Sequence, residues 1–382
     1  MGLLALAEVE RGARARLPAP IWDFIAGGSG EERTLAANLT QFGHYALRPR
    51  VLVDVSVCDP SVTLLGSPLR TPIGVAPMAY HRLVDPEGET ATARAAGRTG
   101  TLLVAGIFAS RSLEEIAAAA TGPLWLQLYW LRRREVLAGL VERAEAAGYL
   151  ALVLTVDAPR VGRRLRDLRN GFAVPSGVRA VNLDPELMAA SHRGGAGASG
   201  IEDHAREQFD PALTWSDLAW LRARTRLPLV LKGILTAEDA RLAAEHGADA
   251  VVVSNHGGRQ LDGALTSLAA LPEVVDALPP DFPVLFDGGV RTGTDIAVAL
   301  ALGARAVLVG RPVLWGLAVG GEDGAAEVLD LLGTELTHAM ALLGRPRLRD
   351  LDRGALGAAA FAPPLTSRHP TGTTGGRTGL QR

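Results

Sequence analysis

A histidine and an arginine, His256 and Arg259, stand three residues apart directly after the apolar run 250–253. An imidazole is suited to act as a general base near neutral pH, and a guanidinium binds a carboxylate through two parallel hydrogen bonds. The two glycines between them let a flat ligand approach the backbone. A polar turn after a strand explains the glycines, but not the histidine and the arginine together. This segment therefore predicts a base and an anion clamp at one strand end.

Asp157 and Lys232 follow two other apolar runs and extend this chemistry. A carboxylate stabilises the imidazolium that forms when a histidine takes a proton, so Asp157 is the expected partner of His256. The alternative for Asp157 is a turn residue before Ala158. Lys232 is expected to lie beside an electron-rich cofactor ring and to stabilise negative charge on it. The alternative interpretation is that Lys232 faces solvent.

Eight short apolar runs alternate with helical patterns, and each run is continuous, as in strands buried on both faces of a parallel sheet. Such strand–helix units predict an α/β fold, a (β/α)8 TIM barrel. An open doubly wound sheet is the alternative, but it would place a glycine-rich dinucleotide turn after the first strand, where the segment 77–80 stands instead. The runs are 72–78, 101–106, 124–129, 150–157, 227–233, 248–255, 283–289 and 305–311, and helical patterns include 87–99, 113–119, 135–147, 237–246 and 293–302.

The remaining segments are assigned around this barrel, which spans 72–350. Residues 1–71 are expected to form helices and a short hairpin that cover one end. Residues 172–214 form a long insertion after the fourth strand, rich in glycine, serine, alanine and charge, and loops of this kind are often mobile lids. Residues 351–382 form a C-terminal tail, of which 363–382 shows no periodicity and is predicted to be disordered.

Polar residues follow almost every run, and the carboxyl ends of barrel strands are where TIM barrels place catalytic groups. The last two runs carry a phosphate signal. A glycine pair and Arg291 follow Asp287, and Gly310 precedes Arg311. These segments bring flexible amides and two guanidinium groups to the loops where TIM barrels often bind phosphate. Asp287 is expected to hold a ribityl or ribose hydroxyl.

The composition excludes several other classes of protein. The chain has 382 residues, 48% hydrophobic and 21% charged, and its net charge of −2 gives neither a footprint for nucleic acid nor a polybasic membrane patch. Cys58 is the single cysteine, so an intramolecular disulfide and a cysteine-rich metal site are excluded. The N-terminus is typical of an amphipathic helix rather than a signal peptide, and no run of about 18 uncharged apolar residues occurs. A cytoplasmic protein without membrane contact is expected.

Together these motifs resemble the FMN-dependent α-hydroxy acid oxidase and dehydrogenase family, which includes glycolate oxidase, lactate oxidase and mandelate dehydrogenase. The resemblance covers about residues 5–350, and it is highly specific because motifs from nearly every strand end match. The matching segments are 86–89, 127–129, 155–157, 162–164, 231–233, 254–262, 287–291 and 310–312.

The resemblance implies a role for each matching residue. His256 takes a proton while a hydride, or its two-electron equivalent, passes to flavin N5, and Asp157 supports the imidazolium. Arg259 binds the substrate carboxylate with Arg164 close to the same anion, and Tyr129 hydrogen-bonds the substrate; His256, Asp157, Tyr129 and Arg259 are the implied catalytic residues. The implied FMN-binding residues are Pro77, Met78, Ala79, Gln127, Thr155, Lys232, Ser254, Asp287, Gly288, Gly289, Arg291, Gly310 and Arg311.

Three positions depart from the family pattern. Phe24 stands where the family usually supplies a carboxylate-binding tyrosine, Phe108 where short-chain oxidases usually have tryptophan, and Gly106 where a serine near the flavin is usual. With Tyr80, the two phenylalanines are expected to give the pocket aromatic character and to favour an aryl substrate. The alternative interpretation is that Phe24 and Phe108 pack in the core. The segments 23–30, 127–132 and 163–167 resemble most the 4-hydroxymandelate oxidase branch.

The implied activity is FMN-dependent oxidation of an (S)-2-hydroxy acid, mandelate or 4-hydroxymandelate, to the 2-oxo acid, with O2 reduced to H2O2. Ala79 resembles the oxidases, whereas the membrane mandelate dehydrogenases tend to have glycine there. Three alternatives stay open: a dehydrogenase with a non-oxygen acceptor, an oxidase of aliphatic acids such as lactate or glycolate, and a flavin-binding protein without catalysis. The resemblance also implies a homo-oligomer, a tetramer or an octamer.

Overall fold

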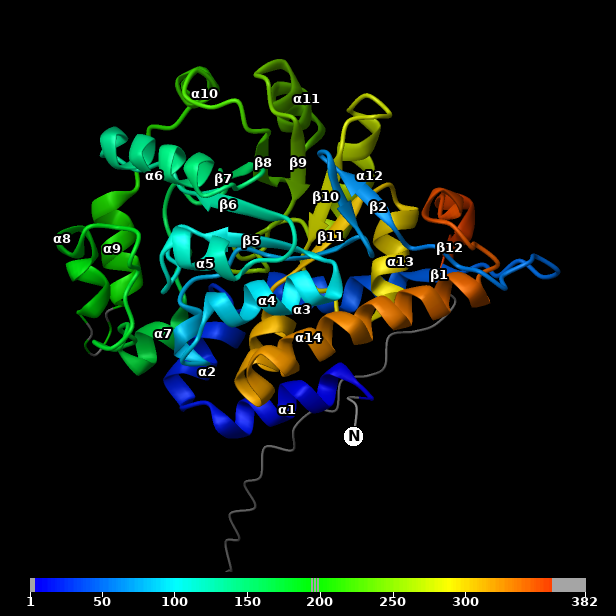
Figure 1. The fold of residues 1–382 in the computed structure, drawn as a ribbon, viewed down its shortest axis with the longest axis horizontal. Helices are drawn as coiled ribbons and strands as arrows, with labels where there is room; N and C mark the ends of the chain where they lie inside the picture. The colour runs from blue at the N-terminus through cyan, green and yellow to red at the C-terminus, as the bar shows by residue number, and fades with distance from the viewer. Residues whose placement is uncertain (1–3, 194, 196, 198, 359–382) are drawn as a thin grey trace, which may run out of the picture.

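A closed barrel of eight parallel strands forms the centre of the computed structural model, which describes residues 4–193, 195, 197 and 199–358 (Figure 1). The strands follow one another in chain order, and the last pairs with the first to close the barrel. This confirms the predicted (β/α)8 barrel over the open sheet. The strands are β4 (Ile73–Val75), β5 (Leu102–Gly106), β6 (Leu124–Leu128), β7 (Leu152–Thr155), β8 (Leu229–Ile234), β9 (Ala250–Val253), β10 (Val284–Asp287) and β11 (Ala306–Val309).

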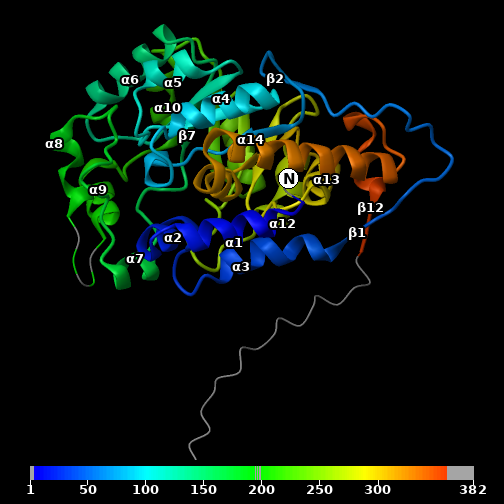
Figure 2. The same cartoon turned by 60° about the horizontal axis from the view of Figure 1, so that its bottom comes forward.

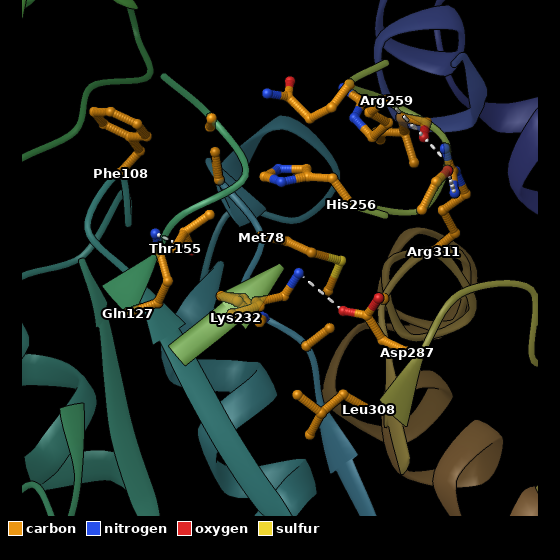
Figure 3. A pocket seen from close by; sticks show the side chains of 18 of the residues that line it. Met78, Phe108, Gln127, Thr155, Lys232, His256, Arg259, Asp287, Leu308 and Arg311 are labelled. Carbon is orange, nitrogen blue, oxygen red and sulfur yellow. Dashed lines mark hydrogen bonds and ion pairs between the residues drawn. The ribbon is translucent and has the colours of Figure 1, made fainter. Parts of the chain in front are cut away.

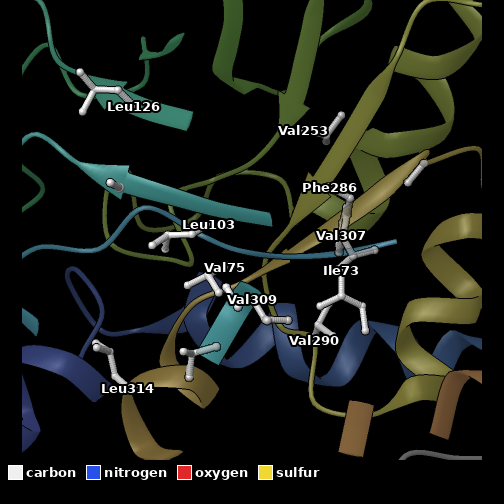
Figure 4. Close-up of a cluster of buried hydrophobic side chains, with 14 of the residues drawn as sticks. Ile73, Val75, Leu103, Leu126, Val253, Phe286, Val290, Val307, Val309 and Leu314 are labelled. Carbon is white, nitrogen blue, oxygen red and sulfur yellow. The ribbon is translucent and has the colours of Figure 1, made fainter. Parts of the chain in front are cut away.

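The barrel strands bury side chains on both faces. In β9, Ala250 and Val252 belong to the cluster inside the barrel, whereas Val251 and Val253 pack outward against helices. Figure 4 shows part of the outer layer, including Phe286 of β10. Because neither face meets water, the strands are continuous apolar runs rather than alternating ones.

Helices surround the barrel and begin at side-chain caps. Ser112, Thr236 and Thr292 each accept a hydrogen bond from the backbone N–H three residues further on, which satisfies one free donor at the helix start. The helices that follow the strands are α4 (Glu89–Thr99), α5 (Leu113–Ala119), α6 (Arg134–Ala146), α11 (Ala237–Glu245), α12 (Ser267–Asp276), α13 (Gly293–Ala301) and α14 (Arg311–Leu342).

The longest helix, α14, contains a break at Gly320 and Gly321, where the backbone leaves the helical region. It lies between α4 and α1 in both views of the fold (Figures 1 and 2). Within the described part of the chain, no helix is both long enough and apolar enough to cross a membrane.

The N-terminal extension covers both ends of the barrel, whereas the sequence predicts cover at one end. Leu64 and Leu69 of a hairpin join the interior cluster just before the first barrel strand begins. At the opposite end, the side chains of Asn38 and Asn255 exchange hydrogen bonds of 2.9 and 2.8 Å directly after β9. The extension comprises α1 (Leu6–Arg16), α2 (Ala19–Ala26), α3 (Arg33–Thr40), β1 (Tyr45–Leu47), β2 (Val62–Leu64) and β3 (Ser67–Leu69).

The insertion 172–214 packs against the barrel mouth. Phe172 stacks on Phe24 of α2 with ring centroids 4.5 Å apart, and Phe209 stacks on Tyr129 at the same distance. The predicted long loop thus contains short helices whose side chains enter the core. The insertion contains α8 (Pro185–Met188) and α9 (Gly200–Gln208); α7 (Leu165–Asn170) precedes it and α10 (Leu218–Arg222) follows it.

The predicted C-terminal tail is partly built into the fold. Strand β12 (Leu356–Ala358) pairs antiparallel with β1 and ties this end of the chain to the N-terminal extension. The segment 363–382, predicted to be disordered, lies outside the described residues.

Candidate active site

The predicted cofactor residues lie on the inner face of the barrel at the carboxyl ends of its strands. Every second residue of a strand faces the same side. Because Val153 and Val230 belong to the interior cluster, Thr155 and Lys232, two residues further on, continue the same inward-facing column. The same two-residue step leads from the interior cluster to Met78, Gly106, Gln127, Ser254, Asp287 and Gly310.

These strand ends border a cavity with about 1360 Å³ of empty space, part of which opens to solvent (Figure 3). Asp157 and Ser254 stand one layer behind it, hydrogen-bonded to the lining residues His256 and Lys232. The other predicted residues line the cavity, namely Phe24, Pro77, Met78, Ala79, Tyr80, Phe108, Gln127, Tyr129, Thr155, Arg164, Lys232, His256, Arg259, Asp287, Gly288, Gly289, Arg291, Gly310 and Arg311.

His256 is held between an acid and a phenol. Its Nδ1 lies 2.9 Å from Asp157 Oδ1, and its Nε2 lies 3.4 Å from the Tyr129 hydroxyl. A carboxylate only accepts, so Nδ1 carries the proton and Nε2 keeps its lone pair. His256 has a φ of +59°, a conformation that costs free energy for a residue with a side chain and is typical of functional sites. Gly233 makes room for the acid, since a Cβ there would lie 2.5 Å from the Asp157 Cβ.

Electrostatics prepares this pair for proton transfer. Burial lowers the pKa of His256 below its ordinary value; Asp157 opposes this effect, and Lys232 adds to it. Burial alone would raise the pKa of Asp157, but the neighbouring His256 and Lys232 outweigh it and hold that pKa below its ordinary value. Near neutral pH the imidazole is therefore neutral beside an ionised carboxylate, which is the arrangement that a general base needs.

Four partly buried arginines, Arg164, Arg259, Arg291 and Arg311, give the cavity an excess of positive charge. Burial, followed by the charges of Arg164 and Arg311, holds the pKa of Arg259 well below its ordinary value. Burial, followed by the charge of Arg291, lowers the pKa of Arg311 to about 9. The Arg164 Nε is buried and has no hydrogen-bond partner among the described residues. A bound anion would relieve this repulsion, so the cluster favours ligands that carry carboxylate or phosphate groups.

Lys232 and Asp287 form a buried ion pair on the cavity floor. Lys232 Nζ lies 2.9 Å from Asp287 Oδ2 and donates a hydrogen bond of 2.8 Å to the Ser254 hydroxyl. The other carboxylate oxygen, Asp287 Oδ1, is buried without a hydrogen-bond partner in the described part of the chain. A buried acceptor of this kind suits a ligand hydroxyl.

Replacing Asp287 with alanine is expected to destabilise the fold by about 3–5 kcal/mol, because the Lys232 ammonium would stay buried without its counter-charge. Urea unfolding of the two proteins measures the difference. Asp276→Ala is the matched control, since Asp276 pairs with Arg353 at 2.7 Å on the surface, where an ion pair contributes about 0–1 kcal/mol. Equal effects of the two substitutions would contradict the importance of the buried pair.

The predicted phosphate loops meet at the N-terminus of α14. Helix N-termini carry partial positive charge and free amides, and Gly310 and Arg311 stand where this end reaches the cavity. Arg311 donates hydrogen bonds of 2.9 and 2.8 Å to the carbonyls of Ile25 and Gly27, so a phosphate there would compete with the end of α2 for this guanidinium. Arg291 lies over the ring of Trp315, 4.9 Å from its centroid.

Close packing explains two of the glycine positions. A Cβ on Gly289 would lie 2.0 Å from the carbonyl oxygen of Asn38, so α3 requires glycine there independently of any ligand. A Cβ on Gly106 would lie 2.9 Å from the carbonyl oxygen of Met78. Glycine in place of the family's usual serine thus lets the loop after β4 cross close to β5.

An aromatic wall faces His256 across the cavity. The predicted aromatic residues line the pocket. They also pack against one another, since the Phe108 ring centroid lies 5.6 Å from that of Tyr129 and 6.3 Å from that of Tyr80. The insertion completes this wall with Phe209 and His204. These two residues follow no barrel strand, so the pattern of strand ends did not predict them. Their rings within the predicted insertion were the available signal.

Known proteins resemble this chain over nearly its whole length. Residues 13–358 match the model of a family described as FMN-dependent dehydrogenase. The chain belongs to that family. Its relatives include a 4-hydroxymandelate oxidase of Amycolatopsis orientalis, 50% identical over 90% of this chain and 95% of the relative. An L-lactate oxidase of Nostoc sp. is also 50% identical, over 92% of this chain and 97% of the relative.

Solved structures give the same result. A crystal structure of mandelate oxidase with (S)-4-hydroxymandelic acid matches with a TM-score of 0.89 and 48% identity, and covers 93% of this chain and 98% of that one. The FMN-dependent protein described here is therefore a (β/α)8 flavoenzyme. Its cavity suits FMN, because the unpartnered Asp287 oxygen fits a ribityl hydroxyl and the arginine cluster fits a phosphate.

Proposed function

We propose that this enzyme oxidises an aryl (S)-2-hydroxy acid, such as mandelate or 4-hydroxymandelate, to the 2-oxo acid and passes the electrons to O2. The observation that carries the proposal is the placement of His256 between a buried arginine cluster and an aromatic wall. An arylated hydroxy acid has three matching parts: a carboxylate, a carbon that loses hydrogen, and a ring. Relatives named for mandelate and 4-hydroxymandelate oxidation support this choice.

FMN would lie over the strand ends, with Lys232, Gln127 and Thr155 along its ring and Asp287 at its ribityl chain. Gln127 Nε2 donates a hydrogen bond of 3.0 Å to the Thr155 hydroxyl, which holds both side chains in place. Further contacts would come from Pro77, Met78, Ala79, Ser254, Gly288, Gly289, Arg291, Gly310 and Arg311. When bound, FMN would accept two electrons and one hydrogen from the substrate; their passage to O2, together with the proton that His256 has taken, would give H2O2.

The protein residues divide the remaining work. Arg259 and Arg164 would bind the substrate carboxylate, and the Tyr129 hydroxyl would hydrogen-bond the substrate beside His256. His256 Nε2 would take one proton as the second hydrogen and the electron pair leave the substrate, so that its C–OH becomes C=O. Asp157 would stabilise the resulting imidazolium, 2.9 Å from Nδ1. Phe24, Tyr80 and Phe108 would surround the aryl ring.

The pH profile of kcat/KM is expected to rise with pH and to level off, because only the unprotonated form of His256 accepts a proton. Burial lowers the pKa of His256, so the rising limb should lie below the ordinary histidine value of 6.5. Asp157→Asn removes the charge that raises this pKa, so the limb should move to still lower pH while the plateau rate falls. A limb that does not move in this variant would contradict the assignment of the limb to His256.

Aerobic turnover with a panel of 2-hydroxy acids tests the proposed function. (S)-Mandelate and (S)-4-hydroxymandelate should give one 2-oxo acid per H2O2, with kcat/KM values above those for lactate and glycolate. The L-lactate oxidase relative makes aliphatic acids the second candidate substrates, and a higher kcat/KM for lactate would establish them. Turnover with an artificial dye but without H2O2 would instead indicate a dehydrogenase with a non-oxygen acceptor.

The family resemblance also supports a homo-oligomer, and we propose a tetramer or an octamer in the cytoplasm. The single cysteine is compatible with a reducing compartment, because no intramolecular disulfide is needed. Light scattering of the FMN-loaded protein would measure the mass of the assembly.

A further inference from the structure

The far end of the aromatic wall contains a polar atom that the proposed reaction does not use. His204 in α9 is buried, with 1% of its surface exposed, and lines the cavity. Its Nδ1 lies 3.0 Å from the backbone carbonyl of Leu187. A carbonyl only accepts, so Nδ1 carries the proton and Nε2 has a free lone pair. This Nε2 is buried and lacks a hydrogen-bond partner among the residues that the structure describes.

The orientation of the His204 ring is fixed from three sides. Phe108 and Phe209 both meet it edge to face, at interplanar angles of 81° and centroid distances of 5.2 and 6.4 Å. The bond to Leu187 fixes which edge of the imidazole carries Nδ1. Burial lowers the pKa of His204 to about 4, so the ring is neutral near pH 7 and Nε2 can only accept a hydrogen bond.

The place of His204 relative to the base follows from the ring contacts. His256 lies 6.5 Å from Tyr129, Tyr129 lies 5.6 Å from Phe108, and Phe108 lies 5.2 Å from His204, between ring centroids. The ring contacts thus join His204 to His256 only through Tyr129 and either Phe108 or Phe209. A substrate whose reacting carbon lies beside His256 and whose carboxylate lies beside Arg259 would extend its ring along this wall.

We propose that His204 recognises a hydroxyl group on the substrate's aryl ring by accepting its hydrogen bond at Nε2. The inference rests on the proposed function and narrows it, because it makes a ring with a phenolic donor the preferred substrate over an unsubstituted ring. A site with a buried acceptor discriminates against an analogue that leaves this acceptor unpaired.

The first test compares a hydroxyl with fluorine, which is of similar size and donates no hydrogen bond. In the FMN-loaded wild-type protein, kcat/KM for (S)-4-hydroxymandelate should exceed that for (S)-4-fluoromandelate by about 10-fold to 100-fold. 4-Hydroxyphenylacetate and 4-fluorophenylacetate, which have no 2-hydroxyl to oxidise, should differ in Kd in the same direction by calorimetry. Equal Kd values and equal kcat/KM values would overturn the inference.

The second test assigns the preference to His204. His204→Phe should reduce the hydroxyl-to-fluorine ratio to about 1, because only the hydroxyl compound loses a hydrogen bond to Nε2. His192→Phe is the matched control, because His192 also anchors its Nδ1 on a carbonyl of the insertion, Val174 at 2.9 Å, but does not line the cavity. A ratio that survives in His204→Phe would overturn the assignment.

These results separate the inference from the proposed function. If no aryl 2-hydroxy acid is oxidised, the proposed function fails. The comparison of Kd for 4-hydroxyphenylacetate and 4-fluorophenylacetate still decides whether His204 binds a phenolic hydroxyl. If mandelate is oxidised and neither Kd nor kcat/KM distinguishes the hydroxyl from fluorine, the inference alone fails. Should His204→Phe not fold, His204→Gln keeps an acceptor oxygen and should retain part of the ratio, and the wild-type comparison stands without any variant.

Discussion

Replacing His256 with alanine is expected to slow the reduction of bound FMN by substrate about 10²-fold to 10⁴-fold, the usual contribution of a positioned general base. His256 Nε2 is the imidazole nitrogen that faces the cavity with a free lone pair beside Tyr129, and Asp157 stands behind it. Asp157 cannot replace it, because its carboxylate lies one layer away from the cavity. FMN should stay bound, since the Lys232–Asp287 pair and the arginine cluster are unchanged.

Anaerobic stopped-flow absorbance of the FMN-loaded variant measures this rate, and the flavin spectrum before mixing reports FMN content. His246→Ala serves as the control, because His246 stacks on Trp215 at a centroid distance of 5.8 Å, away from the cavity. Its reduction rate should equal that of the wild type. Full retained reduction in His256→Ala would remove His256 from the role of base.

Replacing Arg259 with methionine is expected to lower kcat/KM for (S)-mandelate by about 10²-fold to 10³-fold. Losing one partner of a buried charge pair costs about 2–5 kcal/mol, which is a factor of about 30 to 5,000, and the expected loss lies within this range. Methionine keeps an apolar side chain of similar length but removes the guanidinium, whose Cζ lies 5.3 Å from the Phe24 ring centroid. The substitution also removes the hydrogen bond of 2.7 Å that Arg259 donates to the Gly27 carbonyl, but this carbonyl keeps the hydrogen bond of 2.8 Å from Arg311.

Mandelamide separates a lost anion clamp from a general disturbance of the site. The amide lacks the negative charge, so Arg259→Met should affect its oxidation far less than that of mandelate. Arg305→Met, on the exposed outer surface, is the control and should leave both reactions unchanged. Equal losses for mandelate and the amide would show that Arg259 does not bind the carboxylate.

Most of the fold could be predicted because the barrel strands bury both faces. This burial produces the continuous apolar runs, each of which coincides with one observed strand, although β8 continues one residue past its run to Ile234. The same geometry made the site predictable, since most residues that follow an inward-facing column at a strand end enter the cavity, although Ser254 stands one layer behind it. Thr155, Lys232 and Asp287 all obey this rule.

Tertiary packing outside the strands could not be predicted in the same way. The N-terminal extension covers the two ends of the barrel through long-range contacts, such as that between Asn38 and Asn255. No local sequence pattern encodes these contacts. The insertion shows the same limit. Its short helices are stabilised by aromatic contacts with Phe24 and Tyr129, so His204 and Phe209 gave no periodic signal in the sequence.

The glycines illustrate a different limit. The glycine pair after β10 suggested a phosphate loop, but contact with α3 already requires Gly289. Arg311 binds carbonyls of α2, which sequence reasoning did not foresee because α2 lies nearly 300 positions earlier in the chain. Residue types thus predicted which groups gather at the site, whereas only the structure showed which residue each group contacts.

Anaerobic mixing of the FMN-loaded protein with (S)-mandelate tests the central claim most directly, because it measures electron transfer from substrate without any later acceptor. The oxidised flavin absorbance should be lost in one turnover, and one phenylglyoxylate should form for each FMN that is reduced. (R)-Mandelate should leave the flavin oxidised. A flavin that stays oxidised with every aryl and alkyl (S)-2-hydroxy acid would contradict the account.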